Sequence, residues 1–199
     1  MIDLINIASD LPHNKFLDLY HKALKEKQRG IEAIAISSYD KSSNEVASRF
    51  VNLKYISGNE WIFFSNYLSP KAIQFESHDQ ISALFYWGAI NSQIRLKAKI
   101  NKTSVEFSDN HFQSRSKEKN ALAISSNQSQ PIDSFASVKE NFYTTLSSMN
   151  SESQRPEYWG GYSFTPYYFE FWEGHENRLN KRHVFSMEEG SWRASLLQP

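Results

Sequence analysis

Short segments with the pattern of β-strands recur along the 199-residue chain, and most of them arrive as neighbours joined by polar turns. The clearest is 92–100 (SQIRLKAKI), where apolar and polar residues alternate as in a strand with one buried face. Strands are also predicted at 31–37, 46–56, 60–66 and 81–87, and in the segments YYFEFWEG, RHVFSM and SWRASLL. The pair 46–56 and 60–66, joined by the turn SGN, is expected to form a hairpin. Hairpins with inserted helices favour a mainly β, α+β antiparallel barrel over a doubly wound sheet.

Several segments have the spacing of amphipathic helices. Residues 14–29 carry apolar side chains at i, i+3 and i+4, with Asn14 as the expected cap and Gly30 as the stop. Helices are also predicted for 104–124, as one segment, for 135–149, and for a short stretch from Ser69. The polar loop 125–134 is too short to separate two cores, so we expect one domain spanning 1–199, with a flexible segment at 1–13.

Charge and composition exclude several classes of function. Lys and Arg number 22, as do Asp and Glu, so the chain lacks the net positive charge on which non-specific nucleic-acid binding depends. The absence of cysteine excludes disulfides and thiolate catalysis, and the six histidines lack the spacing of metal ligands, so no metal site is predicted. The N-terminus does not have the pattern of a signal peptide, and no window approaches the roughly 20 apolar residues of a membrane span. A soluble, cytoplasmic protein is therefore expected.

Two segments contain residues suited to binding an anion. At Ser69 a good helix cap precedes Pro70 and Lys71, and the free backbone N–H groups of a helix start form an anion site. The helix dipole disfavours a cation there, so Lys71 is best explained by a bound anion, although a simple helix start stays an alternative. In strand 46–56, Arg49 and Lys54 would point to opposite faces, roughly 16–17 Å apart. They would then serve two ligands, or parts of a long one, unless both are solvated edge charges.

Three further groups suit a phosphate and a flat ring. His111, Arg115 and Lys119 would share one face of a continuous helix, as a second phosphate site or as a solvated face. The carboxamide of Gln93 both donates and accepts, which suits the imide edge of a flavin or pyrimidine. Near the C-terminus, Trp172 is followed by Arg178 and Arg182, whose guanidinium groups suit phosphate or carboxylate; the alternative is a structural tryptophan packed by arginine.

The order of these motifs resembles the pyridoxamine 5′-phosphate oxidase family from about residue 14 to Pro199. The matching motifs are R-x-V-x-L-K, F-S-N, S-x-K-A, LFYW followed by Q, F-x-S-R, Q-S, WGGY and EFW-x-G…R-L-x-x-R. The resemblance implies a split antiparallel β-barrel that binds FMN at the interface of a homodimer, in a site drawn from two subunits. It also implies an FMN-dependent oxidase of pyridoxine or pyridoxamine 5′-phosphate, in which hydride passes from C4′ of the substrate to the flavin and dioxygen is reduced to hydrogen peroxide.

Carried over residue by residue, the resemblance implies two sets of contacts. The cofactor set is Arg49, Lys54, Phe64, Ser65, Ser69, Lys71, Gln93, Gln128, Ser129, Trp172 and Arg182. The substrate set is Lys54, His111, Arg115 and Lys119 for the phosphate, with Asn180 and the catalytic Arg178 against the ring.

The chain departs from the family pattern at five positions within these motifs. Pro70 stands where the family has an arginine, His111 where it has a tyrosine, Lys119 a serine, Asn180 a histidine and Lys181 an aspartate. Most departures fall in the substrate set. Two alternatives therefore stay open: an FMN oxidoreductase on another substrate, resembling the phenazine-biosynthesis oxidases, and a flavin- or pyridoxal-phosphate-binding protein with little turnover.

Overall fold

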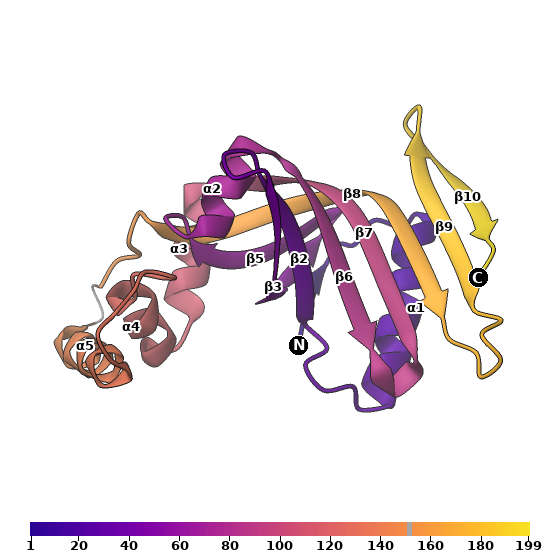
Figure 1. Ribbon diagram of the computed structural model, residues 1–199. Helices are drawn as coiled ribbons and strands as arrows, with labels where there is room; N and C mark the ends of the chain where they lie inside the picture. Colours follow the sequence, from indigo (N-terminus) through magenta and orange to yellow (C-terminus); the bar gives the residue numbers. More distant parts are fainter. Residues whose placement is uncertain (151–152) are drawn as a thin grey trace.

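The computed structural model describes residues 1–150 and 153–199 (Figure 1). Its strands are β1 (Asp3–Ile5), β2 (Ala33–Asp40), β3 (Glu45–Asn52), β4 (Tyr55–Ser57), β5 (Glu60–Asn66), β6 (Gln80–Trp87), β7 (Ser92–Lys102), β8 (Trp159–Glu173), β9 (Lys181–Glu188) and β10 (Ser191–Leu197). Its helices are α1 (Leu11–Lys25), α2 (Pro70–Ser77), α3 (Val105–Ser114), α4 (Lys117–Ser125) and α5 (Phe135–Ser148), with a short 3-10 helix η1 (Gly88–Ile90). Over the part of the chain that the structure describes, no helix is long and apolar enough to cross a membrane.

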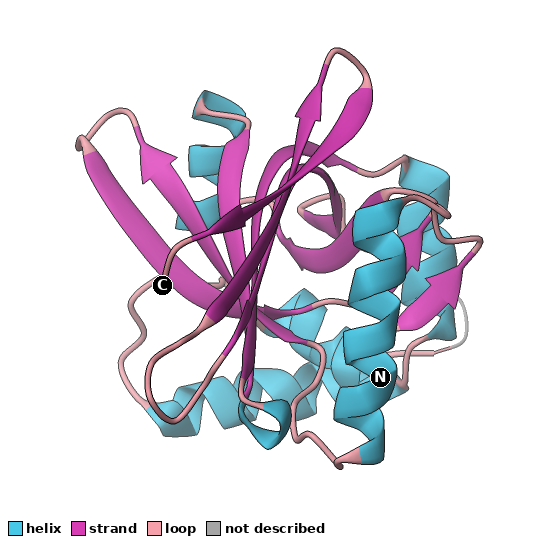
Figure 2. Cartoon of the chain, turned by 90° about the vertical axis from the view of Figure 1, so that its right-hand side faces the viewer, coloured by secondary structure: helices cyan, strands magenta, loops and turns pink. Residues whose placement is uncertain are grey.

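The strands form one sheet of ten, in the order β1-β4-β5-β8-β7-β6-β2-β3, with β9 and β10 added beside β8. The pairing of β1 with β4 is parallel, and the other pairings are antiparallel. The strands twist and curve around a common interior, but β1 and β3, at the two ends of the order, are not paired (Figure 2). The α+β class and the antiparallel barrel predicted from the sequence are confirmed, and the barrel is open.

Helix α1 supplies the central side chain of the core. Phe16 is fully buried, and its ring centroid lies 4.6 Å from Trp61, 6.1 Å from Phe85 and 5.8 Å from Trp87. The helix begins three residues earlier than predicted because Asp10, not Asn14, is its cap: the Asp10 carboxylate accepts the backbone N–H of His13.

Residues 1–13, for which the sequence predicts a flexible segment, pack against the rest of the fold. Strand β1 pairs with β4, and Ile2 is buried with its backbone N–H donated to the hydroxyl of Tyr20 at 3.1 Å. Asp10 also accepts a hydrogen bond from the indole of Trp192 in β10 at 2.9 Å. Residues 1–13 therefore contact α1, β4 and β10, a set of long-range contacts that no local pattern in this segment indicates.

The predicted strand 46–56 is two strands, because the backbone changes partner at Leu53. The N–H of Leu53 donates to the carbonyl of Glu32, whereas that of Lys54 donates to the carbonyl of Ile62. Strand β3 consequently pairs with β2, and only β4 forms the hairpin with β5. Since Arg49 and Lys54 do not share a strand, the prediction that they point to opposite faces of one strand is wrong.

The predicted helix 104–124 is also broken, at Arg115 and Ser116. Arg115 has an extended backbone (φ −81°, ψ 157°), and Ser116 caps the new helix α4. Helix α3 lies close against β8, since the N–H of Gly161 donates to Ser108 Oγ at 3.1 Å and a Cβ on Gly160 would lie 3.0 Å from the same oxygen. Helices α4 and α5 lie beyond it, at the end of the molecule remote from β9 and β10 (Figure 1).

Candidate functional site

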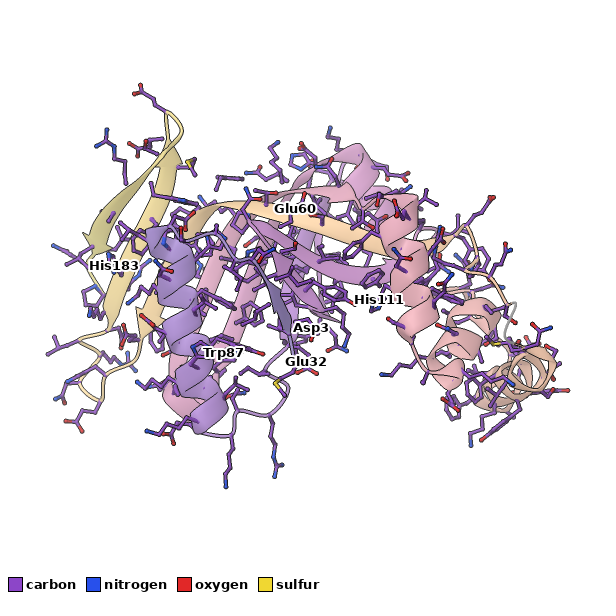
Figure 3. The ribbon with its side chains drawn as sticks, turned by 180° about the vertical axis from the view of Figure 1, so that it is seen from behind. Asp3, Glu32, Glu60, Trp87, His111 and His183 are labelled. Atoms are coloured by element: carbon purple, nitrogen blue, oxygen red, sulfur yellow. The ribbon has the colours of Figure 1, made fainter. Side chains whose placement is uncertain are left out.

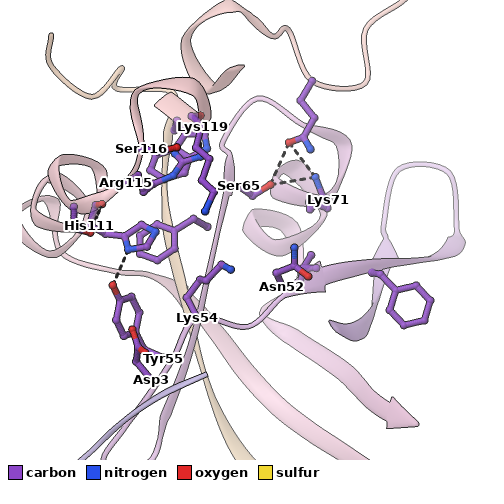
Figure 4. A pocket seen from close by; sticks show the side chains of 16 residues that line it. Asp3, Asn52, Lys54, Tyr55, Ser65, Lys71, His111, Arg115, Ser116 and Lys119 are labelled. Atoms are coloured by element: carbon purple, nitrogen blue, oxygen red, sulfur yellow. Dashed lines mark hydrogen bonds between the residues drawn. The ribbon is translucent and has the colours of Figure 1, made fainter. Parts of the chain in front are cut away.

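A cavity of about 590 Å³ opens where β3, β4 and β5 meet helices α3 and α4 (Figure 4). Four cations contribute to its lining: Lys54, Lys71, Arg115 and Lys119. Among the described residues that line the cavity, Asp3 is the only carboxylate. A smaller cavity of about 200 Å³ shares Arg115 and Lys119 and continues toward α4. The excess of positive charge suits this cavity to an anionic ligand.

Lys71 is a buried cation that pairs with no carboxylate among the described residues. It lies in the first turn of α2 and is 8% exposed, and its ammonium donates to Ser65 Oγ at 3.1 Å, Ser69 Oγ at 3.1 Å and Gln128 Oε1 at 3.3 Å. Burial, followed by the charge of Arg49, lowers its pKa to about 8. Such a cation is stabilised by an anion, and the first turn of α2 adds backbone N–H groups to the same place.

Arg49 strengthens this positive region from outside the lining of the cavity. Its guanidinium donates to Ser38 Oγ at 2.6 Å, to the carbonyl of Ile36 at 3.2 Å and to Gln74 Oε1 at 2.9 Å. These acceptors orient the guanidinium but are neutral. Two neighbouring cations are thus held in place by uncharged groups, and an anion would relieve their repulsion.

Arg115, Lys119 and Lys54 define the other end of the cavity. The break between α3 and α4 means that no continuous helical face carries His111, Arg115 and Lys119, yet the turn brings all three to the cavity. The Arg115 guanidinium lies 4.3 Å from the centroid of Trp159 and donates to the carbonyl of Lys119 at 2.9 Å. Its Nη1 is buried and has no hydrogen-bond partner in the described chain, and burial lowers the pKa of Arg115 to about 10.

Aromatic rings form one wall of the cavity. The rings of Phe64 and His111 stack at 3.6 Å between centroids and 13° between planes, and Trp159 lies 5.4 Å from Phe64 at 15°. The hydroxyl of Tyr55 lies 2.7 Å from Nδ1 of His111. Burial, then the charges of Arg115, Lys54 and Lys119, lower the pKa of His111 to about 4, so the imidazole is neutral at pH 7. Flat apolar rings beside cations suit a flat anionic ligand.

A second group of the predicted residues lies elsewhere, on one face of the sheet. Gln93 is directly opposite Trp172 in β7 and β8, and Trp172 is opposite Arg182 in β9, so the three form a row across the strands. None of them lines the cavity. His183, next to Arg182, lies near one end of the molecule, well away from His111 (Figure 3). Within one chain, the cofactor set therefore divides in two.

The remaining predicted residues lie partly at the main cavity and partly elsewhere. Arg178, at φ 59°, and Asn180 lie in the loop between β8 and β9, where Asn180 Oδ1 accepts the N–H of His175 at 3.1 Å. The Arg182 guanidinium is paired with Glu170 at 2.8 Å, and this hydrogen bond raises its pKa. Gln128 lines the main cavity, whereas its neighbour Ser129 lines a different one between α4 and α5.

Tyr55 and Trp159 are among the residues lining the main cavity that were not predicted from the sequence. Tyr55 directly follows Lys54 but belongs to no motif, and only the fold places it against His111. Trp159 opens the WGGY motif, so the sequence carried a signal for it, but no role was inferred.

Comparison of the sequence with known proteins gives matches to one family. Residues 159–199 match a family model described as the pyridoxine 5′-phosphate oxidase C-terminal dimerisation region. Pyridoxine/pyridoxamine 5′-phosphate oxidase 1 of Hydrogenovibrio crunogenus is 31% identical over 191 residues, covering 94% of this chain and 88% of that protein. Pyridoxine/pyridoxamine 5′-phosphate oxidase of Burkholderia lata is 31% identical over 201 residues, covering 100% of this chain and 93% of that protein.

Two solved structures have the same fold. PhzG from Burkholderia lata 383, in complex with tetrahydrophenazine-1-carboxylic acid, has a TM-score of 0.88 at 22% identity, covering 94% of this chain and 92% of that one. A pyridoxamine 5′-phosphate oxidase-related, FMN-binding protein from Nostoc punctiforme has a TM-score of 0.78 at 12% identity, covering 96% and 99%. The unclosed antiparallel sheet and these two neighbours show that this chain has the FMN-binding split β-barrel fold. The chain belongs to the pyridoxine/pyridoxamine 5′-phosphate oxidase family.

Proposed function

We propose that the protein is an FMN-dependent oxidase that converts pyridoxine or pyridoxamine 5′-phosphate into pyridoxal 5′-phosphate and reduces dioxygen to hydrogen peroxide. The observation that carries the proposal is the cavity itself, in which four cations surround a wall of stacked rings. Both the cofactor and the substrate are flat rings bearing a phosphate. Family membership supports the same reaction class.

The chain's own residues fit FMN. Lys71 and Arg49 are neighbouring cations held by neutral groups, and the start of α2 contributes backbone N–H groups, which together suit the terminal phosphate. Ser65 and Gln128 lie beside Lys71 and would hold the cofactor close to that end. When bound, FMN would supply the redox chemistry by accepting a hydride from the substrate.

The substrate phosphate is assigned to the other end of the cavity. Lys54, Arg115 and Lys119, which all line this end of the cavity, would bind it. Phe64 and Trp159 would exclude water from one side of the ring. Arg178 would orient the substrate from the loop between β8 and β9. Lys119, a cation beyond the family pattern, favours a phosphorylated substrate over the phenazine-like alternative.

In a homodimer with two shared sites, the two groups of predicted cofactor-binding residues would come together, one group from each chain. Gln93, Trp172, Arg178 and Arg182 are remote from the cavity of their own chain but accessible to a second copy that places β7–β9 against it. The matched dimerisation region, 159–199, contains three of these four residues. Symmetry would then give two equivalent sites, each built from both chains.

Titration with flavins tests the cofactor assignment. We expect FMN to bind with one molecule per chain and to lose its fluorescence on binding. Riboflavin, which has the same ring but no phosphate, should bind about 100-fold more weakly, because it lacks the charge-assisted hydrogen bonds to Lys71 and the α2 start. FAD, with its additional nucleotide, should also bind more weakly than FMN. Equal affinities for FMN and riboflavin, or no flavin binding at all, would contradict the proposal.

A further inference from the structure

Tyr55 and His111 form a close pair that joins β4 to α3. The Tyr55 hydroxyl is 2.7 Å from Nδ1 of His111, and the two rings are nearly perpendicular at 84° (Figure 4). The imidazole also stacks flat on Phe64 at 3.6 Å. One contact fixes the plane of the imidazole and the other fixes its rotation within that plane. The orientation of His111 is therefore set by Tyr55 and Phe64 together.

This arrangement leaves one polar atom of the imidazole for a ligand. His111 lines the cavity with Lys54, Arg115 and Lys119, and Nε2 makes no hydrogen bond to any of the described residues. A phosphate oxygen needs a donor at that position, since a lone pair on Nε2 would repel it. Nε2 carries a proton only in the tautomer whose Nδ1 accepts a hydrogen bond.

The protonation states of both side chains allow that tautomer. The pKa of His111 is lowered to about 4 by burial and by Arg115, Lys54 and Lys119, so the imidazole carries a single proton at pH 7. Burial, aided by the charge of Asp3 and opposed by a hydrogen bond from Ser114, raises the pKa of Tyr55. Tyr55 therefore keeps its hydroxyl proton and can donate it to Nδ1.

We propose that Tyr55 is a substrate-positioning residue, whose hydroxyl donates to Nδ1 of His111 so that Nε2–H becomes a fourth donor to the phosphate held by Lys54, Arg115 and Lys119. This role rests on the proposed function of the cavity. Tyr55 acts through His111 and does not itself touch the phosphate. The pair supplies a neutral, directional donor among three cations, and so adds orientation where the cations add attraction.

The test removes only the hydroxyl. Tyr55→Phe keeps the ring contacts with Phe64 and Phe107, at 6.2 Å and 5.5 Å, so the fold is expected to be unchanged. Tyr39→Phe is the matched control, because it removes a hydroxyl bonded to Asn44 outside the main cavity. In ¹⁵N-histidine NMR spectra at pH 7, with His111→Phe for assignment, we expect the wild type to show the Nε2–H tautomer of His111. Tyr55→Phe should show a mixture of tautomers.

Ligand binding supplies the second measurement. With the FMN-loaded protein, we expect Tyr55→Phe to raise the Kd for pyridoxine 5′-phosphate and the KM about tenfold, with kcat and the Kd for FMN unchanged and with no effect of Tyr39→Phe. Unchanged substrate affinity in Tyr55→Phe, or an Nδ1–H tautomer in the wild type, overturns the proposal. The tautomer is also measured on flavin-free protein with inorganic phosphate, so failure of FMN or substrate binding would count against the proposed function separately.

Discussion

Lys71→Met is expected to stabilise the protein against unfolding while weakening FMN binding by about 10- to 100-fold. Lys71 is buried, its partners are neutral, and burial lowers its pKa to about 8. Keeping this ammonium charged in the folded protein costs free energy that methionine, of similar length, does not require. We expect the free energy of unfolding of the flavin-free protein to rise by about 1–3 kcal/mol at pH 7.

The stabilisation by Lys71→Met should depend on pH, because it follows from the pKa of Lys71. Because the pKa of Lys71 is about 8 in the folded protein and 10.5 ordinarily, the unfolded chain holds its proton to higher pH. The buried charge of Lys71 therefore destabilises the folded wild-type protein fully below pH 8, and this destabilisation declines as the pH rises toward 10.5. Urea unfolding at pH 7 and at pH 10 should show a larger advantage for Lys71→Met at pH 7.

Lys117→Met is the matched control, since Lys117 is exposed on α4 and should change stability by no more than about 0.5 kcal/mol. If Lys71→Met instead lowers the free energy of unfolding, or binds FMN as tightly as the wild type, Lys71 is a structural residue and not part of an anion site.

Mixed dimers of two defective variants are expected to recover activity. In the proposed assembly, Lys71 belongs to one chain of each site and Arg178 to the other. Lys71→Met and Arg178→Ala homodimers should both have low activity when FMN is limiting. A mixed dimer would contain one site with both changes and one with neither, so its activity should be about half that of the wild type.

Co-expression with two different affinity tags isolates the mixed dimer for this comparison. Arg178 lies in an exposed loop, so its replacement by alanine should leave the fold intact. Activity of the mixed dimer equal to the mean of the two homodimers would show that each site is built within one chain, and a monomeric protein would exclude the shared site altogether.

The local elements could be predicted because their patterns are local. The alternation in 92–100 corresponds to β7, Ser92–Lys102, and the spacing in 135–149 corresponds to α5, Phe135–Ser148. The break at Leu53 has a different origin, since the backbone there exchanges β2 for β5 as its partner. The interruption at Arg115 contains neither glycine nor proline, and Ser116, a residue type favoured at helix N-caps, is the mark that the sequence carries there.

For the candidate site, the sequence predicts which residue types take part better than it predicts where they lie. Motif order indicated Lys71 and Arg182 alike, but it could not show that they lie in separate regions of one chain. Tyr55 was missed because its partner is 56 residues away in sequence and meets it only through the packing of α3 on the sheet. Contacts of this kind depend on tertiary structure and leave no periodic pattern.

Anaerobic titration of the FMN-loaded protein with pyridoxamine 5′-phosphate tests the central claim most directly. We expect the visible flavin absorbance to bleach in proportion to the added substrate, and to return on admission of air with formation of hydrogen peroxide. Pyridoxamine, which has the same ring without the phosphate, should bleach the flavin poorly because it cannot engage Lys54, Arg115 and Lys119. A yellow protein whose flavin stays oxidised at saturating pyridoxamine 5′-phosphate would contradict the proposed activity.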